Sequence, residues 1–242
     1  MHILGIIPAR YASSRFPGKP LVDIAGKSMI QRVYEQAKKC ADLTEVIVAT
    51  DDERIFDHVA DFGGVAVMTS PNHASGTDRC AEVALQHPEY EVIINIQGDE
   101  PYIDPAQISK LAACFTDANT QIATLIKQIK TEQELFNVNS PKVITNQNSE
   151  AIYFSRSPLP HIRGEEQQNW LEFHTFFKHI GIYGYRADIL KQITKLPVSS
   201  LEKAESLEQL RWIENGYRIK VAETELETHA IDTPGDLLNL KV

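Results

Sequence analysis

Three cationic side chains follow the first apolar run of the chain. Residues 3–7 read Ile-Leu-Gly-Ile-Ile, the run breaks at Pro8, and the loop beyond it contains Arg10, Arg15 and Lys19. Such a run is typical of a strand buried on both faces. Open α/β sheets bind ligands at the carboxyl ends of their strands, and clustered cations suit a polyphosphate. We therefore predict a phosphate-binding loop here; the alternative is a solvated loop with incidental charge.

Carboxylates occur at two places where they could hold a metal ion beside that loop. Asp99 follows the apolar run 91–96, within the sequence Gln-Gly-Asp-Glu-Pro. Residues 233–236 are suited to cap a helix by themselves, which leaves Asp232 available at the expected end of a strand. Mg²⁺ prefers one or two carboxylates together with substrate oxygens. We expect Asp99 and Asp232 to share Mg²⁺; the alternative for Asp99 is an acidic surface turn.

A polar segment, residues 70–79, precedes an amphipathic helical pattern. Its Ser75, its Thr77 and its backbone N–H groups could bind a nucleotide base, ribose or phosphate. The same composition is also typical of an ordinary helix entry. Asp51 and Asp52 follow another apolar run, and we interpret them as a helix cap and a partner of the helix dipole.

Apolar runs alternate with helical patterns along the chain. Strands are predicted at 3–7, 45–50, 65–68, 91–96, 122–126 and 217–222, and helices at 29–37, 51–62, 80–85, 105–115 and 206–212. This alternation predicts an α/β fold with a doubly wound, mostly parallel sheet in a single domain, 1–242. On the helix at 206–212, Glu208 and Arg211 are expected to form a local ion pair.

The middle of the chain has a different pattern. Residues 142–145 and 151–155 read as a β-hairpin, and 179–185 reads as a strand with two glycines. We interpret 130–185 as a region that includes a small β-rich insertion. The histidines of this region lack metal-ligand spacing, so zinc is not expected.

The composition limits the class of protein. The 242 residues carry a formal net charge of -9, which argues against bulk nucleic-acid binding and requires any phosphate site to be a local basic patch. Cys40, Cys80 and Cys114 are scattered along the chain. This spacing is typical of a protein from a reducing compartment. Neither a Walker A loop nor a G-x-G-x-x-G motif is present. Without an apolar run of about 20 residues or a secretion signal, we expect a cytoplasmic protein with no membrane partner.

Several motifs together resemble a known family. The chain resembles the 3-deoxy-manno-octulosonate cytidylyltransferases (CMP-Kdo synthetases) over essentially its full length. The segments that carry the resemblance are 8–21, 73–79, 97–101, 153–158, 179–185, 208–211 and 231–234. The departures, at Ser14, Phe16 and Cys80, remove no charged group. The resemblance implies a Rossmann-like nucleotide-diphospho-sugar transferase fold, and Mg²⁺-dependent conversion of CTP and 3-deoxy-D-manno-octulosonate (Kdo) to CMP-Kdo and diphosphate for lipopolysaccharide biosynthesis. It also implies a homodimer, with residues 142–155 as the candidate for part of the interface.

The resemblance implies a role for each matching residue. Those implied to bind the nucleotide are Pro8, Ala9, Arg10, Arg15, Lys19, Ala74, Ser75, Thr77 and Asp78. Those implied to act in catalysis are Arg10, Lys19, Asp99 and Asp232, of which Asp99 and Asp232 are the metal ligands. Those implied to bind the sugar are Gln97, Arg156, His179, Tyr183, Glu208 and Gln209, with Arg156 on the sugar carboxylate.

Three other functions compete with this interpretation. A cytidylyltransferase for 8-amino-Kdo or a sialic-acid-type sugar would differ in its sugar acid. A nucleotide-binding regulatory module would perform no chemistry, although pure nucleotide binding seldom needs both carboxylates. A metal-dependent phosphohydrolase would release phosphate or diphosphate without any sugar.

Overall fold

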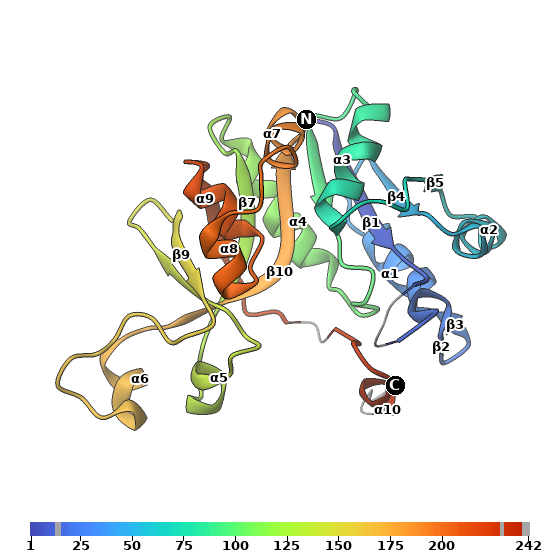
Figure 1. The fold of residues 1–242 in the computed structure, drawn as a ribbon. Helices are drawn as coiled ribbons and strands as arrows, with labels where there is room; N and C mark the ends of the chain where they lie inside the picture. The colour runs from blue at the N-terminus through green and yellow to red at the C-terminus, as the bar shows by residue number, and fades with distance from the viewer. Residues whose placement is uncertain (13–15, 228–229, 239–242) are drawn as a thin grey trace.

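The computed structural model describes residues 1–12, 16–227 and 230–238. Within these residues one sheet has the main strand order β11-β7-β10-β6-β1-β4-β5, and the hairpin β8-β9 joins it through β10 (Figure 1). The strands of this sheet are β1 (Ile3–Ala9), β4 (Glu45–Thr50), β5 (Ala66–Met68), β6 (Val92–Asn95), β7 (Ile122–Gln128), β8 (Lys142–Thr145), β9 (Ala151–Ser155), β10 (Phe177–Arg186) and β11 (Ile219–Glu223). A separate small ribbon pairs β2 (Asp23–Ile24) with β3 (Lys27–Ser28).

The sheet is mostly parallel, as predicted. Strands β6, β1, β4 and β5 run parallel, and so do β7 and β11, whereas β10 runs antiparallel between β6 and β7. The carboxyl ends of β1, β4 and β6 therefore meet at one edge. One prediction needs correction there: the strand does not break at Pro8, because β1 continues through Pro8 to Ala9 in register with β4.

Helices cover both faces of the sheet (Figure 1). Ile3 and Ile7 pack in a core with α1, α2 and α4, while Leu4 and Ile6 pack in a second core with α3, α7 and α9. This division follows from the alternation of side chains along a strand. The helices are α1 (Met29–Ala37), α2 (Glu53–Asp61), α3 (Gly76–Gln86), α4 (Pro105–Ala113), α5 (Glu132–Phe136), α6 (Trp170–Phe173), α7 (Ala187–Ile193), α8 (Ser200–Glu205), α9 (Gln209–Glu214) and α10 (Pro234–Leu238).

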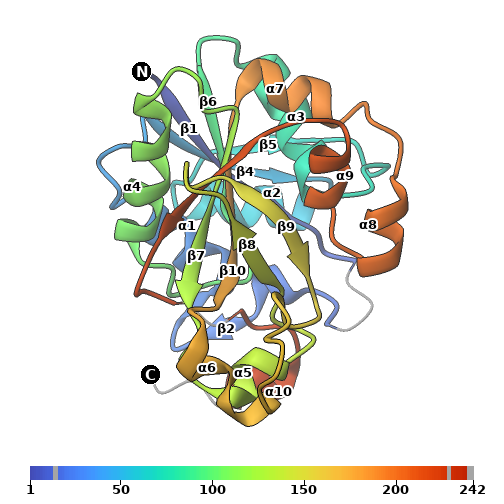
Figure 2. The same cartoon turned by 90° about the vertical axis from the view of Figure 1, so that its left-hand side faces the viewer.

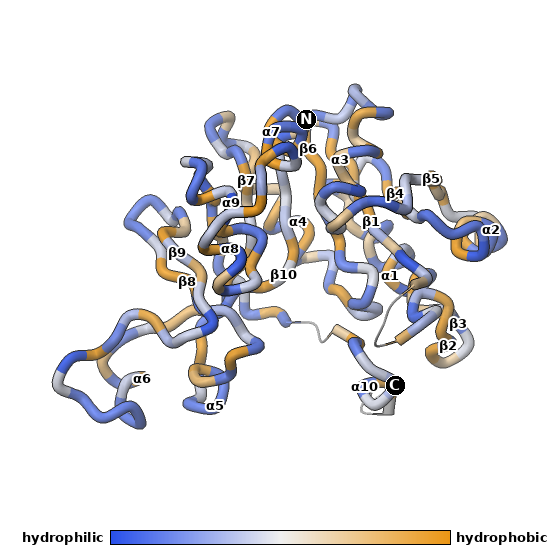
Figure 3. The backbone as a smooth tube through the Cα atoms, in the orientation of Figure 1, coloured by the Kyte–Doolittle hydropathy of each residue, from blue (hydrophilic) through white to orange (hydrophobic). Residues whose placement is uncertain are grey.

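The middle of the chain forms a small lobe, which consists of the hairpin β8-β9 together with α5 and α6, beside the main strands of the sheet. The predicted hairpin is confirmed as the antiparallel pair β8-β9, and Figure 2 shows it in front of β7 and β10. Ile129, Leu135, Trp170 and Phe176 form a separate small core with α5 and α6. The stretch 163–169 before α6 is hydrophilic (Figure 3). The region 130–185 therefore combines this lobe with most of β10, which belongs to the central sheet.

The helix caps follow the sequence, whereas two local ionic predictions do not. Asp52 is the N-cap of α2, and its Oδ1 accepts from the N–H of Arg54 at 3.1 Å. Asp51 does not serve the helix: its carboxylate lies 3.2 Å from the buried Arg79 guanidinium. The predicted pair of Glu208 with Arg211 is wrong, because Arg211 binds Glu202 at 2.6 Å. Among the described helices, none is both long enough and apolar enough to cross a bilayer.

Candidate active site

A pocket of about 560 Å³ opens at the carboxyl ends of β1 and β6, beside the start of α3. It lies at the sheet edge where the sequence places its cationic loop and the Asp99 carboxylate. Both polar side chains and small residues line it: Pro8, Ala9, Arg10, Ala12, Lys19, Pro20, Ala74, Ser75, Gly76, Gln97, Gly98 and Asp99. The pocket combines cations and a carboxylate, which are the groups that a metal-bound polyphosphate requires.

The loop after β1 is held by its own backbone. The N–H of Gly18 donates to the carbonyl of Tyr11 at 2.9 Å, and Gly18 adopts φ 72°, a left-handed conformation that favours glycine. Lys19 begins a short 3₁₀ turn directly after it. The guanidinium of Arg10 donates to the carbonyl of His73, which ties the loop to the segment before α3. Arg15, predicted to bind the triphosphate, lies outside the described residues.

Two carboxylates from distant parts of the chain converge on Lys19. Its Nζ lies 2.8 Å from Oδ2 of Asp99 and 3.5 Å from Oδ1 of Asp232. The N–H of Ile231 also donates to the backbone carbonyl of Asp99 at 2.9 Å, so the two segments are joined by backbone as well as by charge. Asp99 and Asp232 therefore lie close to the same ammonium group, which is the proximity that sharing a metal ion would require.

The local setting of Asp232 differs from the prediction in one respect. Asp232 does not follow a strand; it lies in an irregular segment after β11 and before α10. The helix start is served without it, as predicted, because Asp236 accepts from the N–H of Thr233 at 2.7 Å. Asp236 also accepts from the N–H of Asp232 at 3.0 Å, which helps to fix that residue.

The donor chemistry of this cluster fits Mg²⁺. Two carboxylates already surround one cationic group, the ammonium of Lys19, so the position favours positive charge. Among the described residues, no group of three or more His, Cys, Asp or Glu side chains is placed to hold a metal. Mg²⁺ does not need such a group, because it is commonly bound by one or two carboxylates plus phosphate oxygens and water.

The start of α3 presents backbone groups to the pocket. Ser75 and Asp78 form a capping box: the Ser75 hydroxyl accepts from the N–H of Asp78 at 3.2 Å, and the Asp78 carboxylate accepts from the N–H of Ser75 at 3.0 Å. Asp78 and Thr77, both predicted to bind the nucleotide, thus make contacts within the protein, since the Thr77 hydroxyl donates to Glu208 at 2.6 Å. The pocket itself is lined by Ala74, Ser75 and Gly76.

The residues predicted to bind the sugar fall into separate groups. Gln97 lines the pocket, and its amide donates to the carbonyl of Gly181 at 2.7 Å. His179 and Tyr183 lie on β10 with ring centroids 5.1 Å apart, and Nε2 of His179 is 3.0 Å from the Thr124 hydroxyl. Burial lowers the pKa of His179 to about 4 and raises the pKa of Tyr183 well above its usual value, so both rings are neutral at pH 7.

Glu208 and Gln209 connect α9 to this region. Gln209 is buried, and Glu208 accepts from the Thr77 hydroxyl. Burial raises the pKa of Glu208, while hydrogen bonds from Thr77 and Ser75 oppose that rise. Glu208 therefore links α9 to the start of α3.

Arg156 lies in the small lobe, at the end of β9. Its guanidinium donates to the carbonyls of Glu205 at 2.6 Å, Val138 at 3.0 Å and Ser206 at 3.3 Å. It is not among the residues that line the pocket. The structure therefore places Arg156 apart from the pocket at the sheet edge, on the side of the small lobe.

Comparison with known proteins identifies the family. A Cytidylyltransferase family profile matches residues 4–220. A 3-deoxy-manno-octulosonate cytidylyltransferase of Parabacteroides distasonis is 62% identical over 242 residues, which cover 98% of this chain and 96% of the relative. The protein of the same name from Bacteroides thetaiotaomicron is 56% identical over 241 residues, with 98% and 96% coverage.

The chain belongs to the 3-deoxy-manno-octulosonate cytidylyltransferase family.

Two solved structures resemble this cytidylyltransferase, one in both sequence and fold and the other in fold alone. A structure of CMP:2-keto-3-deoxy-manno-octonic acid synthetase complexed with CTP is 44% identical, with a TM-score of 0.91, and the match covers 99% of this chain and 96% of that one. A 4-diphosphocytidyl-2C-methyl-D-erythritol synthase from Anaerococcus prevotii shares the fold, with a TM-score of 0.61 at 12% identity and coverage of 98% and 95%.

Two structural features of this cytidylyltransferase, one beside the pocket and one in the interior, escaped prediction from sequence. A Cβ atom on Gly98 would lie 2.8 Å from the carbonyl oxygen of Pro8, so only glycine lets the loop after β6 pass so close to β1. Its position directly before Asp99, after an apolar run, was the available signal. The buried Arg79, which faces Asp51 and donates to Thr69, gave no local signal, because its partners come from other segments.

Proposed function

We propose that this cytidylyltransferase transfers the cytidylyl group of CTP to the anomeric hydroxyl of Kdo and releases diphosphate. The observation that carries the proposal is the convergence of Lys19, Asp99 and Asp232 beside a pocket that Arg10 also lines. The names of the relatives and the CTP complex of the similar structure support the choice of both substrates.

The chain's own residues supply position and charge. Arg10 and Lys19 would hold the triphosphate, and Lys19 would stabilise the negative charge that develops on the departing diphosphate. The N-terminal end of α3 would hold the nucleoside through backbone groups of Ala74, Ser75 and Gly76. Holding both reactants in line replaces a bimolecular encounter by a step within one complex, which is the main contribution a protein makes to such transfers.

Asp99 and Asp232 would hold Mg²⁺. When bound, that ion neutralises phosphate charge and thereby favours attack on the α-phosphorus. Asp99→Asn and Asp232→Asn should each lower kcat by about 10²-fold or more with the fold intact. Asp57→Asn, an exposed carboxylate on α2, is the matched control and should leave kcat unchanged. Near-normal turnover of both site variants would contradict the metal assignment.

The sugar would lie between the pocket and the small lobe. Arg156 would pair with the sugar carboxylate, and Gln97, His179, Tyr183, Glu208 and Gln209 would contact its hydroxyls. The decisive experiment measures diphosphate release from CTP with Mg²⁺, with and without Kdo, and then with 8-amino-Kdo or a sialic acid. Release that requires Kdo supports the proposal. Release without any sugar would indicate a phosphohydrolase, preference for another acid would reassign the substrate, and no release with any acid would leave a nucleotide-binding module.

We also propose that the chain acts in the cytoplasm as a homodimer, in lipopolysaccharide biosynthesis. In the described sheet β9 pairs with β8 alone, and its Ile152 is 52% exposed. An exposed apolar residue on an edge strand favours burial against a second chain. Light scattering should give the mass of a dimer for the wild type and that of a monomer for Ile152→Lys. A monomeric wild type would contradict the proposal.

A further inference from the structure

The C-terminal segment that carries Asp232 is anchored at both ends. At its start, the N–H of Thr224 donates to the carbonyl of Ile126 at 2.8 Å, which extends the pairing of β11 with β7. At its end, Ile231 is 1% exposed and its N–H donates to the carbonyl of Asp99 at 2.9 Å. The described parts of this segment are therefore held at two places, one beside β7 and the other beside Asp99.

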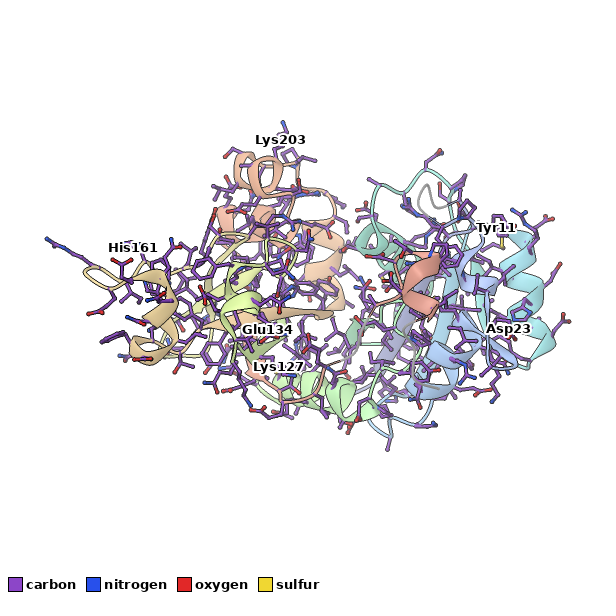
Figure 4. The ribbon with its side chains drawn as sticks, turned by 90° about the horizontal axis from the view of Figure 1, so that it is seen from below. Tyr11, Asp23, Lys127, Glu134, His161 and Lys203 are labelled. Carbon is purple, nitrogen blue, oxygen red and sulfur yellow. The ribbon has the colours of Figure 1, made fainter. Side chains whose placement is uncertain are left out.

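Glu227 lies on this path and binds two lysines. Its Oε1 is 2.6 Å from Nζ of Lys178, and its Oε2 is 3.1 Å from Nζ of Lys127. Lys178 also binds Glu134 of α5 at 2.6 Å. Figure 4 shows Lys127 and Glu134 near each other toward the middle of the molecule, away from Tyr11 and Asp23. The Glu227 carboxylate thus joins the C-terminal segment, called the tail below, to β7 and to β10. Through Lys178 it also joins the tail to α5.

The Lys178 contact differs from an ordinary surface ion pair. The Lys178 side chain is only 7% exposed, so its charge has little access to water. Burial by itself would lower the pKa of Lys178, but hydrogen bonds to Glu134 and Glu227 outweigh burial and raise it, which keeps the ammonium charged. Taking one partner from a buried pair is costly because an uncompensated charge remains.

A neighbouring pair provides an internal comparison. Lys130, just after β7, and Glu225 of the same C-terminal segment lie 3.1 Å apart, but their side chains are 62% and 66% exposed. Exposed pairs of this kind contribute little, since water screens them and long side chains lose entropy on pairing. The comparison separates a general effect of charge near the tail from a specific effect of the buried contact.

We propose that the Lys178–Glu227 ion pair positions Asp232 for metal binding, so that Lys178 and Glu227 act as positioning residues of this enzyme. The inference rests on the proposed Mg²⁺ site. Glu227 and Asp232 are five residues apart, and five residues span at most about 18 Å. Fixing the Glu227 side chain therefore restricts where the Asp232 carboxylate can lie.

The test measures metal binding directly, apart from turnover. Mn²⁺ is titrated into the full-length protein with CTP and without sugar, and electron paramagnetic resonance distinguishes protein-bound Mn²⁺ from Mn²⁺–CTP in solution. Glu227→Gln leaves Lys178 paired with Glu134 and so should fold. It should weaken Mn²⁺ binding at least about three-fold, less than the 10–100-fold typical of partners that touch a metal ligand. The half-saturating Mg²⁺ concentration for turnover should rise in parallel, whereas the KM for CTP at saturating Mg²⁺ should not.

Lys178→Met distinguishes an effect on the position of Asp232 from a long-range effect of charge on cation binding. Removing a positive charge should strengthen cation binding if only long-range electrostatics act, whereas the proposal expects weaker binding, because Glu134 and Glu227 would be left facing each other. Glu225→Gln and Lys130→Met are the matched controls and should leave Mn²⁺ binding unchanged.

The Asp232→Asn background completes the experiment. If the pair acts through Asp232, adding Glu227→Gln to Asp232→Asn should cause no further loss of Mn²⁺ binding. An equal loss in both backgrounds, or a Glu227→Gln protein that matches Glu225→Gln, would overturn the inference while the metal site stands. Wild-type Mn²⁺ binding by Asp232→Asn itself would instead refute the proposed metal site, and the inference with it.

Discussion

Replacing His179 tests whether a neutral, buried imidazole contributes to acid sensitivity. The ring lies against Phe154, with centroids 5.3 Å apart, and Nε2 is 3.0 Å from the hydroxyl of Thr124. Burial lowers its pKa from 6.5 to about 4. In the variant His179→Gln an amide can keep a hydrogen bond to Thr124, but it does not titrate.

The magnitude and the sign follow from linkage. Above pH 7 the imidazole is mostly neutral in both the folded and the unfolded chain, so it adds no pH dependence. Between pH 6.5 and about 4 the unfolded chain binds the proton and the folded chain does not, so stability falls as the pH falls. The loss attributable to His179 is about 2 kcal/mol by pH 5 and about 3 kcal/mol by pH 4.

Urea denaturation at pH 7.5, 6, 5 and 4 measures this loss. The wild type should lose about 2 kcal/mol more than His179→Gln between pH 7.5 and pH 5. His161→Gln, which replaces an exposed imidazole of the small lobe, should behave like the wild type. Equal acid sensitivity of the wild type and His179→Gln would refute the reasoning that His179 is kept neutral by burial.

Three further predictions concern the small lobe and the pocket. Arg156→Ala should raise the KM for Kdo more than that for CTP in steady-state assays, and equal rises would argue against a carboxylate contact. Lys142 donates to the carbonyls of Asn137, Ser140 and Arg156 at 2.7, 2.9 and 2.9 Å. Lys142→Met should therefore lower the free energy of unfolding by about 3 kcal/mol in thermal or urea denaturation. The control Lys130→Met, at an exposed position, should lower it by less than about 0.5 kcal/mol. Gly98→Ala should lower kcat/KM for CTP about ten-fold or more with an unchanged circular dichroism spectrum, because its Cβ would force the loop away from Pro8; a normal value would show that the loop adapts.

Patterns within short segments predicted much of the fold. The β4 strand, the cap at Asp52 and the β8-β9 hairpin all follow from local composition, because hydrogen bonds within a few residues determine them. The errors fell where tertiary contacts compete with local ones. Arg211 has Glu208 three residues away and nevertheless binds Glu202. Glu208 instead accepts a hydrogen bond from the Thr77 hydroxyl.

The sequence alone determined which residues could do the chemistry: a cationic loop after the first strand, two carboxylates near 99 and 232, and the motifs of a sugar-acid cytidylyltransferase. Only the tertiary structure decided that Lys19 lies between those carboxylates, although Lys19 and Asp232 are 213 positions apart. It alone also decided that Lys178 is buried between Glu134 and Glu227. The physical reason is that a local pattern reports the conformation of one segment, whereas an ion pair between remote segments depends on the path of the whole chain.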